Sequence, residues 1–155
     1  MNRVFEPLHT VSLLKKPMAR DKYHDIVRVA LEKDGWTITH DPYFLPIGHK
    51  RSFIDLGAER AIIGAERGKE KIAVEVKSFL APSELDDFED ALEKFMLYMS
   101  VLELKEPDRV LFLAMPQSVF ESLFASSIFY QIAERLELRL LVYNIEKISI
   151  EKWIR

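Results

Sequence analysis

The sequence predicts an α/β fold in which a mixed β-sheet is flanked by helices. Helical and strand-like segments follow one another in the order α-β-β-β-α-β-α-β-β, which is typical of that arrangement. Residues 109–114 are apolar throughout their middle, as expected of a central strand covered on both faces. At 155 residues, the chain is long enough to bury the core of one domain.

We expect residues 18–155 to form that single domain. Residues 1–17 are interrupted by prolines and contain a single small apolar cluster, so we interpret them as an N-terminal extension. The extension is either an arm that docks on a neighbouring copy of the chain, in a homo-oligomer, or the result of an upstream start codon.

Composition excludes several classes of protein. No apolar run approaches the ~20 residues of a membrane helix, so we expect no membrane partner. The absence of cysteine excludes disulfides and thiolate zinc sites and agrees with a cytoplasmic protein. The net charge of −3 argues against a strong autonomous DNA binder, because neutralisation of phosphates dominates non-specific affinity.

The first helix and strand are predicted from periodicity. Residues 21–34 place Tyr23, Val27 and Leu31 on one apolar stripe, and Gly35 stands where a helix-terminating residue belongs. Residues 36–40 then alternate between apolar and polar side chains, which indicates a half-buried strand.

The next two strands are predicted to pair locally. The strand at 53–57 carries Asp55, and the apolar run 61–63 either continues it or forms a strand of its own. Residues 66–69 favour a hairpin connection into the strand at 71–78. Such pairing brings the end of the second strand near the beginning of the first.

A long helix is predicted over residues 83–104. Ser83 is placed to cap it, and the acidic residues between Glu84 and Asp90 suit the positive end of its dipole. We interpret these acids as a solvated face, with a basic protein partner as the alternative. The predicted buried stripe consists of Leu85, Phe88, Leu92, Phe95, Met96, Met99 and Leu102.

In the C-terminal third of the chain, predicted helices are again followed by predicted strands. Residues 116–124 and 128–136 are predicted helices, and residues 138–143 and 148–153 are predicted strands.

The strand at 71–78 carries the candidate chemistry. Side chains alternate along a strand, so Val74 and Val76 point to one face while Glu75 and Lys77 point to the other. Asp55 precedes Glu75 by 19 intervening residues. An aspartate followed at this distance by Glu-x-Lys is the pattern of the PD-(D/E)xK, or restriction-endonuclease-like, fold.

This pattern predicts a divalent-metal site for phosphodiester cleavage. Asp55 and Glu75 are the expected ligands of Mg²⁺ or Mn²⁺, and the carbonyl of Val76 is a third candidate. Lys77 is the expected catalytic cation, which orients the attacking water and stabilises the transition state. The alternative is that Glu75 and Lys77 form the solvated face of an antiparallel strand.

Two further observations bear on this site. Glu-x-Lys also occurs at 103–105, on the predicted helix, where it carries no chemistry. His24 lies beside the apolar stripe of the first helix and is a catalytic candidate; the alternative, which we favour, is a hydrogen bond within the domain.

The sequence resembles the XisH family, the fdxN-element excision controlling factors of cyanobacteria. The resemblance spans residues 18–155 and is carried by segments 21–25, 33–42, 54–59, 71–79 and 107–111. It implies a nuclease-like fold in which Asp55, Glu75 and Lys77 take the metal and lysine positions and His24 takes that of a helix glutamate. Lys94 stands where related nucleases carry glutamine, four residues before Tyr98.

The resemblance also implies partners. Such a protein acts with a site-specific recombinase and an XisI-like companion when a DNA element is excised. Two functions follow: a metal-dependent nuclease acting on DNA, or a non-catalytic accessory factor that works only through protein partners.

Overall fold

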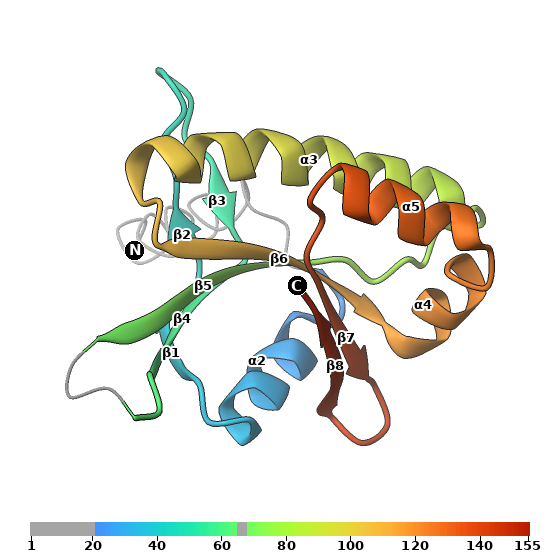
Figure 1. Cartoon of the computed structure of the whole chain (residues 1–155), viewed down its shortest axis with the longest axis horizontal. Helices are drawn as coiled ribbons and strands as arrows, with labels where there is room; N and C mark the ends of the chain where they lie inside the picture. Colours follow the sequence, from blue (N-terminus) through green and yellow to red (C-terminus); the bar gives the residue numbers. More distant parts are fainter. Residues whose placement is uncertain (1–20, 65–67) are drawn as a thin grey trace, which may run out of the picture.

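The computed structural model describes residues 21–64 and 68–155 and shows a mixed sheet between helices (Figure 1). The main sheet has six strands in the order β1-β4-β5-β6-β7-β8, which are Thr37–His40, Leu56–Ala61, Lys69–Val76, Arg109–Pro116, Leu140–Asn144 and Ser149–Ile154. A second, two-stranded sheet pairs β2 (Tyr43–Phe44) with β3 (Phe53–Ile54). The helices are α2 (His24–Lys33), α3 (Glu84–Lys105), α4 (Gln117–Leu123) and α5 (Ser127–Arg135). The predicted α/β fold with a mixed sheet is confirmed.

The central strands β5, β6 and β7 are parallel; β4 and β8 pair with them in antiparallel fashion, and β1 is antiparallel to β4. The parallel pairs are joined by helical crossovers, α3 between β5 and β6, then α4 and α5 between β6 and β7. Helices α3 and α5 cover one face of the sheet and α2 covers the other (Figure 1). The sheet is therefore the middle layer of three.

Each face of the sheet has its own core. On β6, Leu111, Leu113 and Met115 join the core under α3, while Phe112 and Ala114 join the core under α2. All five side chains are at most 2% exposed. β6 is thus the central strand, covered on both faces, that its apolar sequence predicts.

Helix α3 begins as predicted. The hydroxyl of its N-cap, Ser83, accepts a hydrogen bond from the Asp86 backbone N–H at 3.1 Å. Two predictions for this helix are wrong. Leu85 is 50% exposed, and Asp87, expected on a solvated face, is buried under the first turn. The amide of Ala81 donates to its carboxylate at 3.0 Å, which anchors the segment before the helix.

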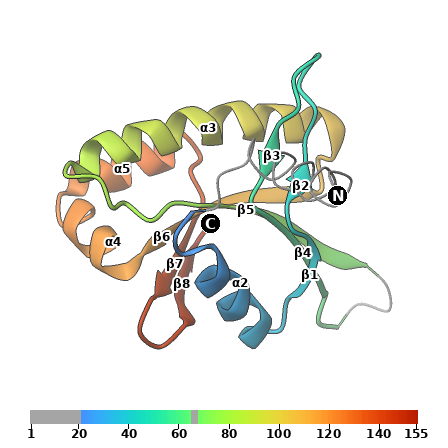
Figure 2. The ribbon, with the colours of Figure 1, turned by 180° about the vertical axis from the view of Figure 1, so that it is seen from behind.

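The segment between β1 and β4 is more ordered than its proline and glycine suggest. It forms the β2–β3 hairpin, whose ladder continues outward through a hydrogen bond from the Leu45 amide to the Ser52 carbonyl and through the Ile47–Lys50 bridge. Its tip rises past α3 in two opposite views (Figures 1 and 2).

The hairpin between β4 and β5 is confirmed by their antiparallel register, Leu56 opposite Val74 and Ala61 opposite Lys69. β4 ends at Ala61, and Ile63 is 97% exposed, so the run 61–63 continues the strand by one residue and does not form another. Part of the predicted connection lies at residues 65–67, outside the described residues, as does the N-terminal extension, 1–17. No helix in the described ranges is long and apolar enough to cross a membrane.

Candidate active site

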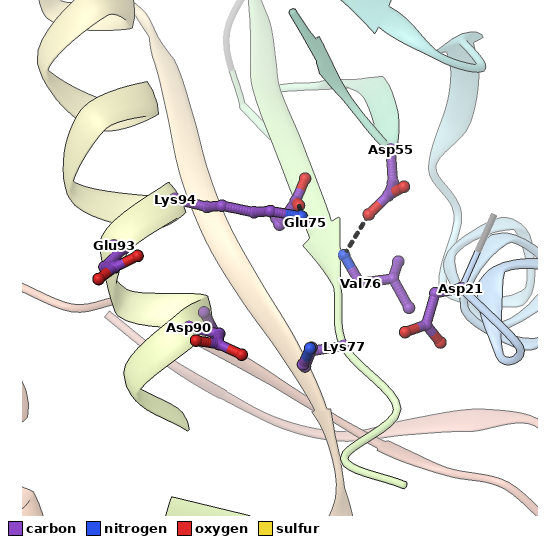
Figure 3. A pocket seen from close by; sticks show the side chains of 9 residues that line it. Asp21, Asp55, Glu75, Val76, Lys77, Asp90, Glu93 and Lys94 are labelled. Carbon is purple, nitrogen blue, oxygen red and sulfur yellow. Dashed lines mark hydrogen bonds and ion pairs between the residues drawn. The ribbon is translucent and has the colours of Figure 1, made fainter. Parts of the chain in front are cut away.

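The site lies at the end of β5, where its ladder with β4 ends. Since Leu56 pairs with Val74, the residue before Leu56 is brought beside the residue after Val74. These residues are Asp55 and Glu75, and both line one cavity of about 380 Å³. The Val76 backbone N–H donates to Asp55 Oδ2 at 2.7 Å, which fixes the aspartate across the two strands (Figure 3). The predicted meeting of Asp55 with Glu75 is confirmed.

Alternation along the C-terminal half of β5 places Glu75, and Lys77 just after the strand, on the α3 face. Val74 and Val76 pack in the core under α2, and Ala73 packs in the core under α3. Glu75 and Lys77 lie on the same face as Ala73, toward α3, as the sequence predicts. The alternative of a solvated face is wrong for Glu75, which is only 7% exposed.

Glu75 is a buried carboxylate with incomplete partners. Its Oε1 atom has no hydrogen bond within the described residues, and Lys94 Nζ on α3 lies 3.8 Å from Oε2. Burial raises the pKa of Glu75 well above its usual value, and the neighbouring charge of Asp55 raises it further, against the opposing effect of Lys94. Burial also raises the pKa of Asp55, opposed chiefly by the hydrogen bond from Val76. Two adjoining carboxyls therefore hold protons more tightly than isolated ones.

Lys77 lines the same cavity, but it is not the cation nearest the carboxylates. Its Nζ lies 3.5 Å from Asp87 Oδ1, while Lys94 extends across the cavity to Glu75 (Figure 3). The site thus has two lysines where the sequence predicts one: Lys77, directly after β5, and Lys94, in the third turn of α3.

His24 lies behind Asp55, on α2. It is 2% exposed, and its Nε2 lies 2.8 Å from Asp41 Oδ1. Its Nδ1 lies 3.9 Å from Asp55 Oδ1 and has no hydrogen-bond partner in the part of the chain that the structure describes. Arg28 also pairs with Asp41. His24 thus makes the hydrogen bond within the domain that the sequence analysis gave as the alternative, and its catalytic role stays a prediction.

Asp21 completes the cavity on the α2 side. It accepts hydrogen bonds from the Ser78 backbone N–H, at 2.8 Å, and from the Ser78 hydroxyl. Its charge adds to the effects that raise the pKa of Asp55. Sequence reasoning placed Asp21 only as the start of a helix and did not single out Asp41.

A second cavity, of about 570 Å³, adjoins the first and shares Asp55, Glu75, Glu93 and Lys94 with it. It extends from the carboxylates to the β2–β3 hairpin.

Within residues 21–64 and 68–155, no group of three or more His, Asp or Glu side chains is placed to hold a metal ion. Any metal held here would thus take two carboxylates together with backbone or water oxygens.

Comparison with known proteins identifies the family. The family model described as XisH protein matches residues 18–151. An XisH family protein from Nostoc punctiforme PCC 73102 is 38% identical, with a TM-score of 0.77 over 87% of this chain and 100% of that chain. An fdxN element excision controlling factor protein from Anabaena variabilis is 39% identical, with a TM-score of 0.76 over 88% of this chain and 100% of that chain. No curated protein sequence matches.

The match covers nearly all of the domain, and it includes every residue of the site described above. The chain belongs to the XisH family.

Proposed function

We propose that this chain is a metal-dependent endonuclease of the PD-(D/E)xK type that acts on DNA when a DNA element is excised. One observation carries the proposal: Asp55 and Glu75 are buried together at a cavity, with raised pKa values and with a Glu75 oxygen that no described residue satisfies. Buried polar atoms are normally paired, so such an exception is a candidate for ligand binding.

The residues present fit a hard divalent cation. Mg²⁺ takes oxygen ligands, keeps several waters and needs only one or two protein carboxylates. Asp55 and Glu75, with the Val76 carbonyl, would hold Mg²⁺ or Mn²⁺. When bound, the metal supplies Lewis-acid activation of water and charge stabilisation on the phosphate.

The surrounding side chains have separate roles. Lys94 and Lys77 place two ammonium groups at the cavity, where they stabilise negative charge that develops on phosphate oxygens. We assign His24 as a positioning residue, because Asp41 orients its ring at 2.8 Å and its Nδ1 lies 3.9 Å from Asp55 Oδ1. Asp87 holds Lys77 at the edge of the cavity.

The biological setting follows from the relatives. The Anabaena variabilis protein is an fdxN element excision controlling factor. We extend this role to the present chain and propose DNA as its substrate, with a site-specific recombinase and an XisI-like companion as its protein partners.

The experiment is nicking of supercoiled plasmid with Mg²⁺, Mn²⁺ or EDTA. We expect metal-dependent nicking that falls by at least ~100-fold in Asp55→Asn and Glu75→Gln, since both remove a ligand charge. Glu103→Gln is the matched control, because Glu103 belongs to the second Glu-x-Lys, on the exposed face of α3. Undiminished nicking by Glu75→Gln, or none by the unaltered chain, would contradict the proposal in favour of a non-catalytic factor.

A further inference from the structure

The β2–β3 hairpin forms one wall of the second cavity and is firmly attached to the domain. Leu45 and Ile54 are at most 2% exposed and pack in the core under α3. At the tip, Ile47 and Lys50 exchange two backbone hydrogen bonds of 3.0 and 2.9 Å, and Lys105 of α3 donates to the Pro46 carbonyl. The side chains that the hairpin displays are therefore held in place relative to the carboxylates.

Two exposed cations on this hairpin line the cavity, Lys50 and Arg51. The guanidinium carbon of Arg51 lies 5.5 Å from the ring centre of Phe44 and 5.8 Å from that of Phe53. Aromatic rings attract a cation and limit its rotamers, so Arg51 is positioned without being neutralised.

The other cations around the site are already paired. Lys77 pairs with Asp87, Lys94 with Glu75 and Arg28 with Asp41. Lys50 and Arg51 form no ion pair with a carboxylate in the described ranges. Among the described residues, Lys50 and Arg51 thus place two unpaired cations beside the carboxylates of a chain whose net charge is −3.

The opposite wall of the cavity is formed by α3, with Tyr98 and Leu97, and its floor is formed by Asp55 and Glu75. A groove with unpaired cations at one end and aromatic rings along its walls suits a nucleic-acid strand, whose phosphates need the cations and whose bases stack on rings.

We propose that the second cavity is the track for the DNA strand next to the bond that is cut, and that Lys50 and Arg51 bind the backbone phosphates adjacent to it. This inference rests on the proposed function, because it takes Asp55 and Glu75 as the position of that bond. It also explains how a chain with a net negative charge could bind DNA. Two positioned cations would contact the phosphates locally, although the chain as a whole is slightly acidic.

The test is fluorescence anisotropy with a labelled DNA duplex in EDTA, where cutting does not occur, over a series of salt concentrations. Lys50→Gln/Arg51→Gln should weaken binding by at least ~10-fold at about 50 mM salt and reduce the slope of log K against log salt by roughly 2, as expected for two lost phosphate contacts. Arg135→Gln/Lys147→Gln is the control, because it removes two exposed charges from α5 and from the β7–β8 turn.

Equal affinity and equal salt slope in the two double variants would overturn the inference, as would an unaltered chain that binds no DNA. The outcome is distinguishable from that of the plasmid assay. DNA binding that depends on Lys50 and Arg51, without metal-dependent nicking, supports the track and contradicts the nuclease. Nicking that is indifferent to both residues supports the nuclease and overturns the track.

Discussion

The two ends of β5 each bury a group of charged side chains, and the two groups differ in how their charges are satisfied. At the N-terminal end, the Arg109 side chain is 2% exposed and donates to both carboxylate oxygens of Glu106, at 2.9 and 3.2 Å, and to the Ile72 carbonyl at 2.9 Å. Glu59 adds a second carboxylate at 3.7 Å. Hydrogen bonding to Arg109 lowers the pKa of Glu106, so this group favours its charged form.

At the other end, Glu75 and Asp55 adjoin one another with Lys94 as the nearest cation, and burial raises both of their pKa values. One end of β5 thus adjoins a group in which an arginine is paired with two carboxylates, and the other adjoins two carboxyls that share one lysine. The difference teaches that burial of charged groups does not by itself indicate a functional site. A buried charged group that lacks a hydrogen-bonding partner does indicate one, because its free oxygen can still bind a ligand, whereas a fully hydrogen-bonded group only stabilises the fold.

The largest effect is expected from breaking the balanced group. Arg109→Met should lower the free energy of unfolding by about 3 to 5 kcal/mol, because it leaves Glu106 and Glu59 without their buried cation. Urea denaturation measures it. Lys71→Met is the control, since Lys71 pairs with Glu106 and Asp108 at a half-exposed position and should cost at most about 1 kcal/mol. If the two variants lost similar amounts of unfolding free energy, the buried pair of Arg109 would be no more important to stability than the half-exposed pairs of Lys71.

Supplying the missing partner should have the next largest effect. Mg²⁺ or Mn²⁺ at 100 times its dissociation constant should raise the free energy of unfolding by about 2.7 kcal/mol, if it binds only the folded chain. Thermal unfolding against metal concentration measures this. Glu75→Gln should abolish the increase, and Glu103→Gln should preserve it. An equal increase in Glu75→Gln would place the metal elsewhere.

The smallest effect is expected from neutralising the excess charge without metal. Glu75→Gln should raise stability at pH 7 by less than bound metal does, because it removes a carboxyl whose charged form burial and Asp55 disfavour. The folded pKa of Glu75 is raised above its usual 4.5, so the native carboxyl keeps its proton while the unfolded one loses it. Stability therefore falls as pH rises from about 4.5 through the folded pKa.

The pH dependence provides the check. In chemical denaturation at a series of pH values, the advantage of Glu75→Gln should disappear below about pH 4, where the carboxyl is protonated in both states. An advantage that persists there would mean that the substitution acts through packing and not through charge.

The sequence predicted those parts of the fold in which one periodicity dominates. The apolar middle of β6 and the alternation along β5 identified both strands and their faces. The β2–β3 hairpin was not predicted, because two-residue strands show no periodicity and Pro46 and Gly48 resemble a loop. Leu85 falls on the predicted stripe but lies in the first turn of α3 and is half exposed.

The site residues likewise divide into those that a local sequence pattern predicted and those that only tertiary packing brings together. Asp55 and Glu75 were predicted because neighbouring strands of a hairpin bring them together. Lys94 was noted only as a departure from a family pattern, and its contact with Glu75 depends on how α3 crosses the sheet. Asp41 follows β1 and reaches His24 only through the packing of α2. Partners set by tertiary packing leave no spacing in the sequence.

The parallel pairing of β5 with β6 has a consequence for when the site appears during synthesis. Asp55, Glu75, Lys77 and Lys94 all precede β6, so both proposed ligands and both lysines are synthesised before the strand that pairs with β5. A nascent polypeptide that ends in α3 contains these four side chains but not the strand that pairs with β5 from Lys71 to Val76. The strand beside β5 thus supports the cavity of about 380 Å³ without contributing any of its lining residues.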